Sequence, residues 1–192
     1  MITHCTLPNN MNVKAKGNTF EREVSEKLSI WLTNGKEKRA CWRSDTSGAS
    51  ATNWAKKKQE ARYVQANMGD IRQLAEKGLY PKLDTFFKKY VVECKHYAKI
   101  DFYPPFNKTL TKFYEACLAE KAATDKKAVL ILKANNRKVL FCQEGADYSP
   151  NINPYFSIYY KTLVLPVYLF DDVVSLANDS NESTGGNSLD NT

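Results

Sequence analysis

The stretch "KKYVVECKHY", residues 88–97, closes an apolar run with a carboxylate and an ammonium two positions apart. Side chains alternate along a strand, so Val91, Glu93 and Lys95 share one face of a strand predicted from about Tyr90 to His96. Burying either charge alone would be costly, so the two charged groups are expected to compensate each other. His96 points to the opposite face, where we expect a structural role.

A second carboxylate is predicted to lie beside Glu93. The segment "MGDIRQL", residues 68–74, begins another strand at Asp70, and the chain between them is long enough to turn back and set the two carboxylates side by side. Adjacent carboxylates repel unless a cation lies between them, and Mg²⁺ takes a few carboxylates together with water and phosphate oxygens. A lysine beside the metal can hold the attacking water. The pattern favours a metal-dependent phosphodiesterase site, while a turn role for Asp70 after Gly69 and a solvated strand edge remain open alternatives.

The periodicities along the chain predict the order helix, three strands, helix, strands. The first helix is expected from about Asn18, a suitable cap, to Thr33, with Asn34-Gly35 ending it. Its apolar stripe consists of Phe20, Val24, Leu28, Trp31 and Leu32. Strands are expected at 40–44, 70–74 and 90–96, and the connection before the third contains the turn-prone "EKGLYPKLD".

The second half of the chain continues this pattern. A helix is predicted at about 110–118, followed by strands at 128–133 and 138–142 around "ANNR", whose asparagines suit a tight turn with positive φ angles. The tyrosine-rich segment 155–170 predicts one or two strands before a short helix capped by Asp171 or Asp172. We expect a single domain over residues 16–177, with a flexible start at 1–15 and a disordered tail at 178–192.

The charge of the chain favours a polyanionic partner. The 192 residues carry a formal net charge of +7, with a pI near 9.1. Most of the excess lies between Lys36 and Arg62, where eight basic residues stand against three acidic ones. We therefore expect DNA backbone contacts from a basic insertion at about 45–68. The chain lacks a glycine-rich phosphate loop, so a nucleotide-binding enzyme and a small-molecule cofactor are not expected.

Cysteine usage and hydropathy predict a cytoplasmic protein. The five cysteines are odd in number and form no C-x-x-C pair, so they are expected to be reduced and mostly buried. No apolar run approaches the roughly 18 residues of a membrane span. The polar start lacks the apolar core of a signal peptide, and no membrane partner is expected.

Several of these motifs together resemble a known superfamily. Gly69-Asp70, followed by "VVECK", resembles the PD-(D/E)XK nucleases. The segment "KGNTFERE", residues 16–23, resembles the K-G-x-x-x-E-R opening of archaeal-type Holliday junction resolvases and related phage-encoded nucleases. The resemblance implies an α/β, restriction-endonuclease-like core, in which helices flank a central mixed sheet. For a phage-encoded protein, it implies action in the host cytoplasm.

The resemblance also implies roles for individual residues. Asp70, Glu93 and the backbone carbonyl of Cys94 would hold Mg²⁺, with Mn²⁺ able to substitute, and Lys95 would serve catalysis. Glu21 would be a further active-site acid and metal ligand. Two alternatives for this acid stay open: Glu21 also fits as the partner of Asn18 in a capping box, and Glu23 is the replacement if the acid is misplaced.

The remaining expectations concern DNA. The predicted DNA-binding residues are Arg43, Ser47, Lys56, Lys57, Lys58, Arg62 and Lys133. The resemblance to junction resolvases implies a homodimer, with the tyrosine-rich segment as a contact surface. The leading hypothesis is a Mg²⁺-dependent DNA endonuclease, with branched DNA in recombination, repair or phage DNA processing as its candidate substrate. The alternative is a non-catalytic nucleic-acid-binding protein on a nuclease-like scaffold.

Overall fold

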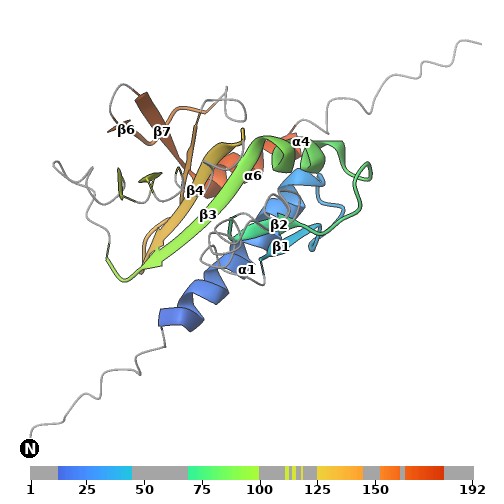
Figure 1. Ribbon diagram of the computed structural model, residues 1–192, viewed down its shortest axis with the longest axis horizontal. Helices are drawn as coiled ribbons and strands as arrows, with labels where there is room; N and C mark the ends of the chain where they lie inside the picture. Colours follow the sequence, from blue (N-terminus) through green and yellow to red (C-terminus); the bar gives the residue numbers. More distant parts are fainter. Residues whose placement is uncertain are drawn as a thin grey trace, which may run out of the picture.

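The protein is built around one mixed sheet (Figure 1). The computed structural model describes residues 13–44, 69–99, 111–112, 114–115, 118, 125–144, 152–160 and 163–179. Within them the strand order is β1-β2-β3-β4-β5-β7-β6, and β3 and β4 are the parallel pair. The strands are β1 (Cys41–Arg43), β2 (Ile71–Gln73), β3 (Tyr90–Tyr97), β4 (Lys127–Ala134), β5 (Leu140–Gln143), β6 (Phe156–Tyr160) and β7 (Leu163–Leu169).

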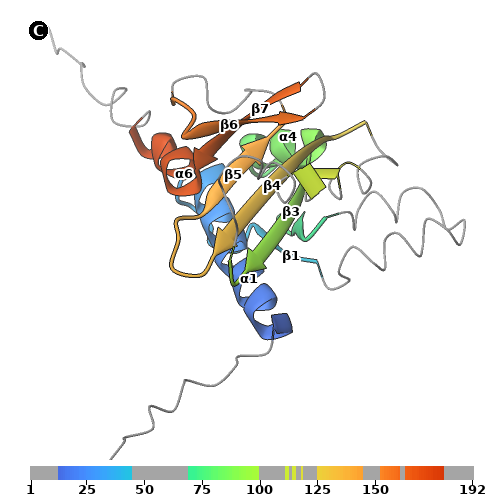
Figure 2. The same cartoon turned by 90° about the vertical axis from the view of Figure 1, so that its left-hand side faces the viewer.

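Helices cover both faces of this sheet (Figure 2). One core lies under α1 (Val13–Leu32), α4 (Pro81–Lys89) and α6 (Phe170–Asp179), against the side chains of Val92 and Val129. The second core lies on the opposite face, where the helical residue Tyr114 packs together with Leu130. The predicted α/β class with a central mixed sheet is confirmed.

The first helix is longer than predicted at its N-terminal end. It begins at Val13, so Asn18 lies inside the helix and the capping-box alternative for Glu21 is wrong. The predicted end is confirmed: Asn34 and Gly35 both have positive φ, and the Gly35 N–H donates to the Ile30 carbonyl at 2.7 Å. The predicted apolar stripe is buried along its whole length.

Other elements differ from the prediction in detail. The connection before β3 contains α4, in which Pro81 occupies the first turn and Leu83 and Phe86 are buried. In the β4–β5 turn, Asn136 is the asparagine with positive φ. Helix α6 begins at Phe170, so Asp171 and Asp172 lie in its first turn and neither is the predicted cap residue before the helix. Their negative charges there interact favourably with the helix dipole.

The described cysteines match the expectation of reduced, buried thiols. Cys41, Cys94 and Cys142 are free of disulfide bonds and buried. Burial raises the pKa of Cys41 and of Cys142 to about 12, so both stay protonated at neutral pH. Among the helices described, none combines the length and apolar character needed to cross a bilayer.

Candidate active site

The candidate site lies at the edge of β3 that faces β2. The register joins Ile71 to Val92, and Asp70, just before β2, places its carboxylate beyond that pair. There Asp70 Oδ2 accepts a hydrogen bond from the Cys94 N–H at 2.8 Å. In an extended strand the N–H and C=O of one residue point to the same side, so the Cys94 carbonyl also faces this edge.

Glycine at position 69 is what allows Asp70 to come this close. Gly69 has a φ of 80°, and an added Cβ would lie 2.6 Å from the Val92 carbonyl oxygen. The Asp70 N–H donates to that same oxygen at 2.8 Å, and the Asp70 carbonyl accepts from the Ser44 N–H at 2.7 Å. Asp70 is therefore fixed between β3 and the end of β1, and its turn geometry and its place in the site are compatible.

The Lys95 ammonium lies beside two buried carboxylates. It forms an ion pair with Glu93 Oε1 and lies 3.8 Å from Asp70 Oδ2. Asp70 is 7% exposed and Glu93 is 3% exposed. Burial raises the pKa of Asp70, while the Lys95 charge and the Cys94 N–H act in the opposite direction. The expected compensation between Glu93 and Lys95 is thus present, and Lys95 serves Asp70 as well.

Glu21 reaches this site from α1. Arg43, at the end of β1, donates from Nε to Glu21 Oε2 and from Nη2 to Asn18 Oδ1, both at 3.0 Å. Burial raises the pKa of Glu21, and the nearby Asp70 charge adds to this, whereas Arg43 and Lys95 lower it. The structure therefore brings together the four predicted catalytic residues.

Asn18, predicted as a helix cap, lies inside α1 and contacts Arg43, a contact that the sequence did not predict. Residues three apart on a helix share a face, so the spacing between Asn18 and Glu21 was the signal available. Arg43 had been predicted as a DNA contact. The structure shows it paired with Glu21 and Asn18 instead of pointing into open solvent.

The donor set fits a small divalent cation. Asp70, Glu93 and the Cys94 carbonyl present oxygen atoms, and Mg²⁺ usually takes one or two carboxylates and keeps several waters. Two buried carboxylates with an ammonium beside them are the charge arrangement that a cation would satisfy. The described part of the chain holds no group of three or more His, Cys, Asp or Glu side chains placed to bind one metal ion. The fit of this site to a metal ion therefore rests on two carboxylates, those of Asp70 and Glu93. The third carboxylate, Glu21, is paired with Arg43 in this structure.

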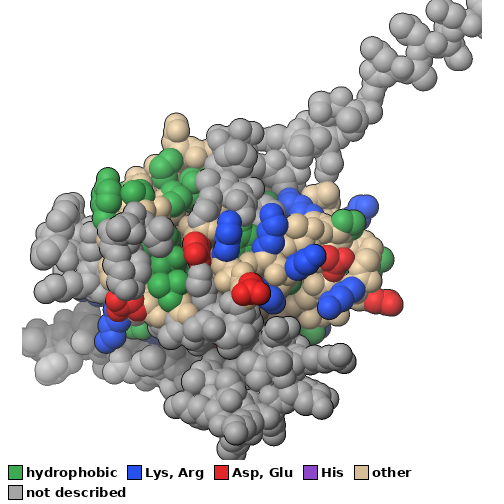
Figure 3. Space-filling view, turned by 45° about the horizontal axis from the view of Figure 1, so that its top comes forward, with side chains coloured by type: hydrophobic (Ala, Val, Ile, Leu, Met, Phe, Trp, Pro, Cys, Tyr) green, Lys and Arg blue, Asp and Glu red, His purple; other side chains and the backbone are tan. Residues whose placement is uncertain are grey.

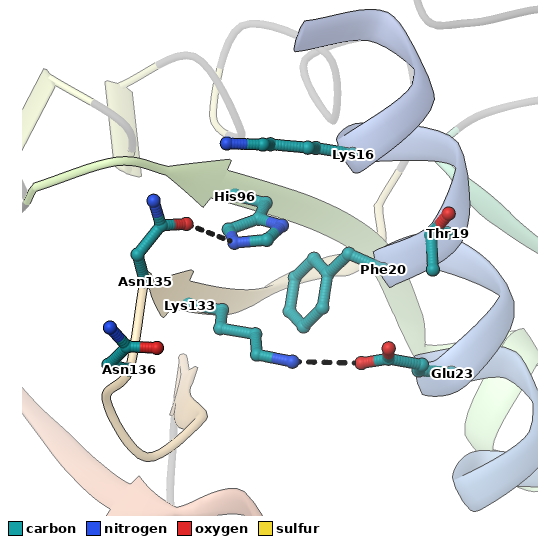
Figure 4. Close-up of a pocket in the computed structure, with 8 residues that line it drawn as sticks. All are labelled: Lys16, Thr19, Phe20, Glu23, His96, Lys133, Asn135 and Asn136. Carbon is teal, nitrogen blue, oxygen red and sulfur yellow. Dashed lines mark hydrogen bonds and ion pairs between the residues drawn. The ribbon is translucent and has the colours of Figure 1, made fainter. Parts of the chain in front are cut away.

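Lys133 and Glu23 line a pocket together (Figure 4), and none of the four predicted catalytic residues lines it. His96 follows Lys95 on β3, so its side chain points to the opposite face of the sheet from that of Lys95. Lys133 is the register partner of His96 on β4 and therefore points to the same face as His96. Lys133 Nζ donates to Glu23 Oε2 at 3.0 Å. The other predicted DNA-binding residues, Ser47, Lys56, Lys57, Lys58 and Arg62, lie outside the described residues.

The mixed sheet with helices on both faces is a restriction-endonuclease-like fold. At the edge of its central strand β3, an Asp meets a Glu-x-Lys pair, and this arrangement is a PD-(D/E)XK-type site. The chain belongs to the family described as "Phage putative PDDEXK endonuclease", whose match spans residues 12–162. No curated protein and no solved structure matches the chain. The predicted superfamily and the phage association are confirmed, and the protein is a nuclease by family.

Proposed function

We propose that the protein hydrolyses DNA phosphodiester bonds as a metal-dependent endonuclease that uses Mg²⁺, with Mn²⁺ able to substitute. The observation that carries this proposal is the juxtaposition of Asp70, Glu93 and Lys95 at the edge of β3. A solvated strand edge would leave the two carboxylates exposed, whereas here both are buried. Buried carboxylates that share one cation are typical of functional sites.

Each residue has a defined role in this proposal. Asp70, Glu93 and the Cys94 carbonyl would hold Mg²⁺, and the ion would supply positive charge to offset that of the scissile phosphate. Lys95 gives up its contacts with the two carboxylates, and its ammonium orients the attacking water by a hydrogen bond. Glu21, released from Arg43, would supply a further carboxylate near the ion. Arg43 then contacts a phosphate of the substrate.

DNA binding in this proposal uses the basic part of the chain. Ser47, Lys56, Lys57, Lys58 and Arg62 stay predicted backbone contacts, together with Arg43 and Lys133. The net charge of +7 supports an anionic substrate, because basic side chains that neutralise phosphates release counterions. Action on branched DNA is the finer form of the proposal, and it rests on the resemblance of residues 16–23 to junction resolvases.

A homodimer is proposed through β6 and β7. Three apolar side chains there are more than half exposed: Tyr155, Tyr159 and Val164. Tyr159 and Val164 are cross-strand partners, so they share one face. Figure 3 shows hydrophobic side chains gathered on the side of these strands, with Lys and Arg side chains toward the opposite end. An exposed apolar patch beside a polar surface is typical of protein contacts. Light scattering of the protein with and without DNA tests this proposal, and a strict monomer would contradict it.

The decisive experiment separates cleavage from binding. Wild type, Asp70→Asn and Lys95→Ala are compared for Mg²⁺-dependent cleavage of supercoiled, linear, single-stranded and four-way-junction DNA. We expect both variants to lose cleavage by orders of magnitude while they still bind DNA. Asp70→Asn removes a negative charge that faces phosphate, so its DNA affinity should be unchanged or higher.

Two results would contradict the proposal. If both variants fold normally and cleave at the wild-type rate, the edge of β3 is structural. If wild type binds DNA but cleaves none of the substrates with either metal, the non-catalytic alternative holds. Circular dichroism of each variant serves as the folding control.

A further inference from the structure

A second site lies on the opposite face of the sheet from the candidate active site. A pocket of about 380 Å³ opens there between the N-terminal half of α1 and the ends of β3 and β4 (Figure 4). Its volume falls within the range of about 300–1,000 Å³ that is typical of ligand pockets. Its lining includes Lys16, Phe20, Glu23, His96, Lys133 and Asn135.

The pocket is separated from the active site by β3 and α1. His96 follows Lys95 on β3, and successive side chains on a strand point to opposite faces. On α1, Glu21 bonds to Arg43 whereas Glu23 bonds to Lys133. Residues two apart on a helix point about 200° apart. One helix thus contributes a carboxylate to each of two sites.

The walls of the pocket favour an anion. Lys133 Nζ lies 5.8 Å from the centre of the Phe20 ring and donates to Glu23 Oε2 at 3.0 Å. Figure 4 shows the Lys16 side chain extending from α1 across the same pocket. Two ammonium groups and one carboxylate leave a net charge of +1 with neutral histidine. Lys133 already binds an anionic oxygen in this pocket, that of the Glu23 carboxylate, whose side chain is 49% exposed.

The histidine adds a further donor indirectly. His96 Nε2 lies 3.1 Å from Asn135 Oδ1, so with the proton on Nε2 the amide oxygen is occupied and the Asn135 NH₂ group is left to donate. His96 Nδ1 is buried and has no hydrogen-bond partner among the described residues. Ammonium and amide donors around one cavity match phosphate oxygens, which only accept.

We propose that this pocket binds a backbone phosphate of a nucleic-acid strand, away from the phosphate that is cleaved. The inference rests on the proposed function for the nature of the substrate. Lys133 would exchange Glu23 for the phosphate, and Glu23 would turn to solvent. An exposed ion pair of this kind contributes little stability, so the exchange is readily made. Glu23 therefore acts as an internal competitor that weakens DNA binding.

The test measures DNA binding without cleavage. Lys133→Ala and Glu23→Gln are made in the Asp70→Asn protein, and the affinity for a fluorescent oligonucleotide is followed by anisotropy over a salt series with EDTA. Two matched variants control for overall charge: Lys27→Ala removes a lysine paired with Asp171, and Glu26→Gln removes an exposed carboxylate of the same helix.

We expect Lys133→Ala to weaken binding about tenfold, as for one charge-assisted hydrogen bond. Its plot of log K against log salt should be shallower by about 0.9 on duplex DNA or about 0.7 on a single strand. Glu23→Gln should bind several-fold more tightly than Glu26→Gln. If both pocket variants behave like their matched controls, the proposal is overturned.

A second readout separates a nucleic-acid strand from a free nucleotide. The chain has two histidines, so the ring signals of His96 are readily assigned by NMR with His4→Ala as reference. We expect an oligonucleotide to shift these signals at lower concentration than thymidine 5′-monophosphate or inorganic phosphate does. Equal potency of the mononucleotide would assign the pocket to free nucleotides and overturn the proposal.

The two proposals fail in different ways. A wild-type protein that cleaves DNA while oligonucleotides leave the His96 signals unchanged would remove the pocket from DNA binding and leave the active site intact. A wild-type protein that neither binds nor cleaves DNA would remove both.

Discussion

Replacing Lys95 with methionine should destabilise the metal-free protein through the two carboxylates that the ammonium serves. Lys95→Met keeps most of the side-chain volume but leaves Asp70 and Glu93 buried without their cation. Removing one partner of a buried ion pair typically costs about 3–5 kcal/mol. Lys95 is itself about a quarter exposed, so we expect the lower end, about 3 kcal/mol. With an m-value of about 2 kcal/mol/M, the urea midpoint should fall by about 1.5 M.

The pH dependence of this loss follows from the carboxylates. Burial raises the pKa of Asp70 and the Lys95 charge lowers it, so the variant should have a still higher pKa in the folded state. A carboxyl group whose pKa is higher in the folded than in the unfolded state loses stability as pH rises from its unfolded pKa, about 4, to its folded pKa. The difference between wild type and Lys95→Met should therefore shrink below about pH 4 and be largest at neutral pH.

Metal should reverse the loss, because a cation replaces the missing ammonium. At about one hundred times its Kd, Mg²⁺ should stabilise the folded variant by about 2.7 kcal/mol. Urea unfolding at pH 4 and pH 7.5, with EDTA or with Mg²⁺, measures all three effects. The control is Lys27→Met, which breaks the exposed pair with Asp171 and should cost at most about 1 kcal/mol. Equal midpoints for wild type and Lys95→Met at both pH values would refute the reasoning.

Three further predictions concern the surroundings of the site. Gly69→Ala should lower the free energy of unfolding by about 1–3 kcal/mol and reduce cleavage, because a Cβ there meets the Val92 carbonyl; thermal unfolding beside a cleavage assay checks this. Arg43→Ala should raise the pKa of Glu21, moving the acidic limb of the pH–rate profile to higher pH, and an unmoved limb would exclude Glu21 as a required carboxylate. Replacing Lys56, Lys57 and Lys58 with Ala should flatten the salt dependence of duplex binding by about 0.9 per lost contact; an unchanged slope would assign them to a solvated face.

Local patterns predicted the parts of the site that depend on local geometry. Glu93 and Lys95 share a face because strand side chains alternate, and this held whatever packed around them. Asp70 was predicted beside Glu93, and the close approach that Gly69 permits explains why it arrives there. Helix α1 was recognised because its apolar stripe repeats over four turns, a signal long enough to exclude a strand.

The misses have equally specific causes. Helix α4 spans nine residues, begins at Pro81 and comes shortly after Gly78, and glycine and proline are both typical of turns. A proline in the first helical turn replaces an N–H that has no helical partner, so it favours this start. The N-terminal extension of α1 was missed because Asn18 suits a cap, whereas its side chain bonds to Arg43, a residue 25 positions away. Contacts across such a separation depend on how β1 packs against α1, which no local pattern contains.

This packing also explains how several acidic groups can lie close together in the two sites. Arg43 pairs with Glu21, Lys95 pairs with both Asp70 and Glu93, and Lys133 pairs with Glu23. Each of these carboxylates thus has a basic partner from another element or from the same strand. Without Lys95, burial would favour the protonated form of Asp70 more strongly. The basic partners are also the groups that a phosphate would attract. Metal binding at the carboxylates and phosphate binding at the freed cations should therefore favour each other, and Mg²⁺ affinity should rise when DNA is present.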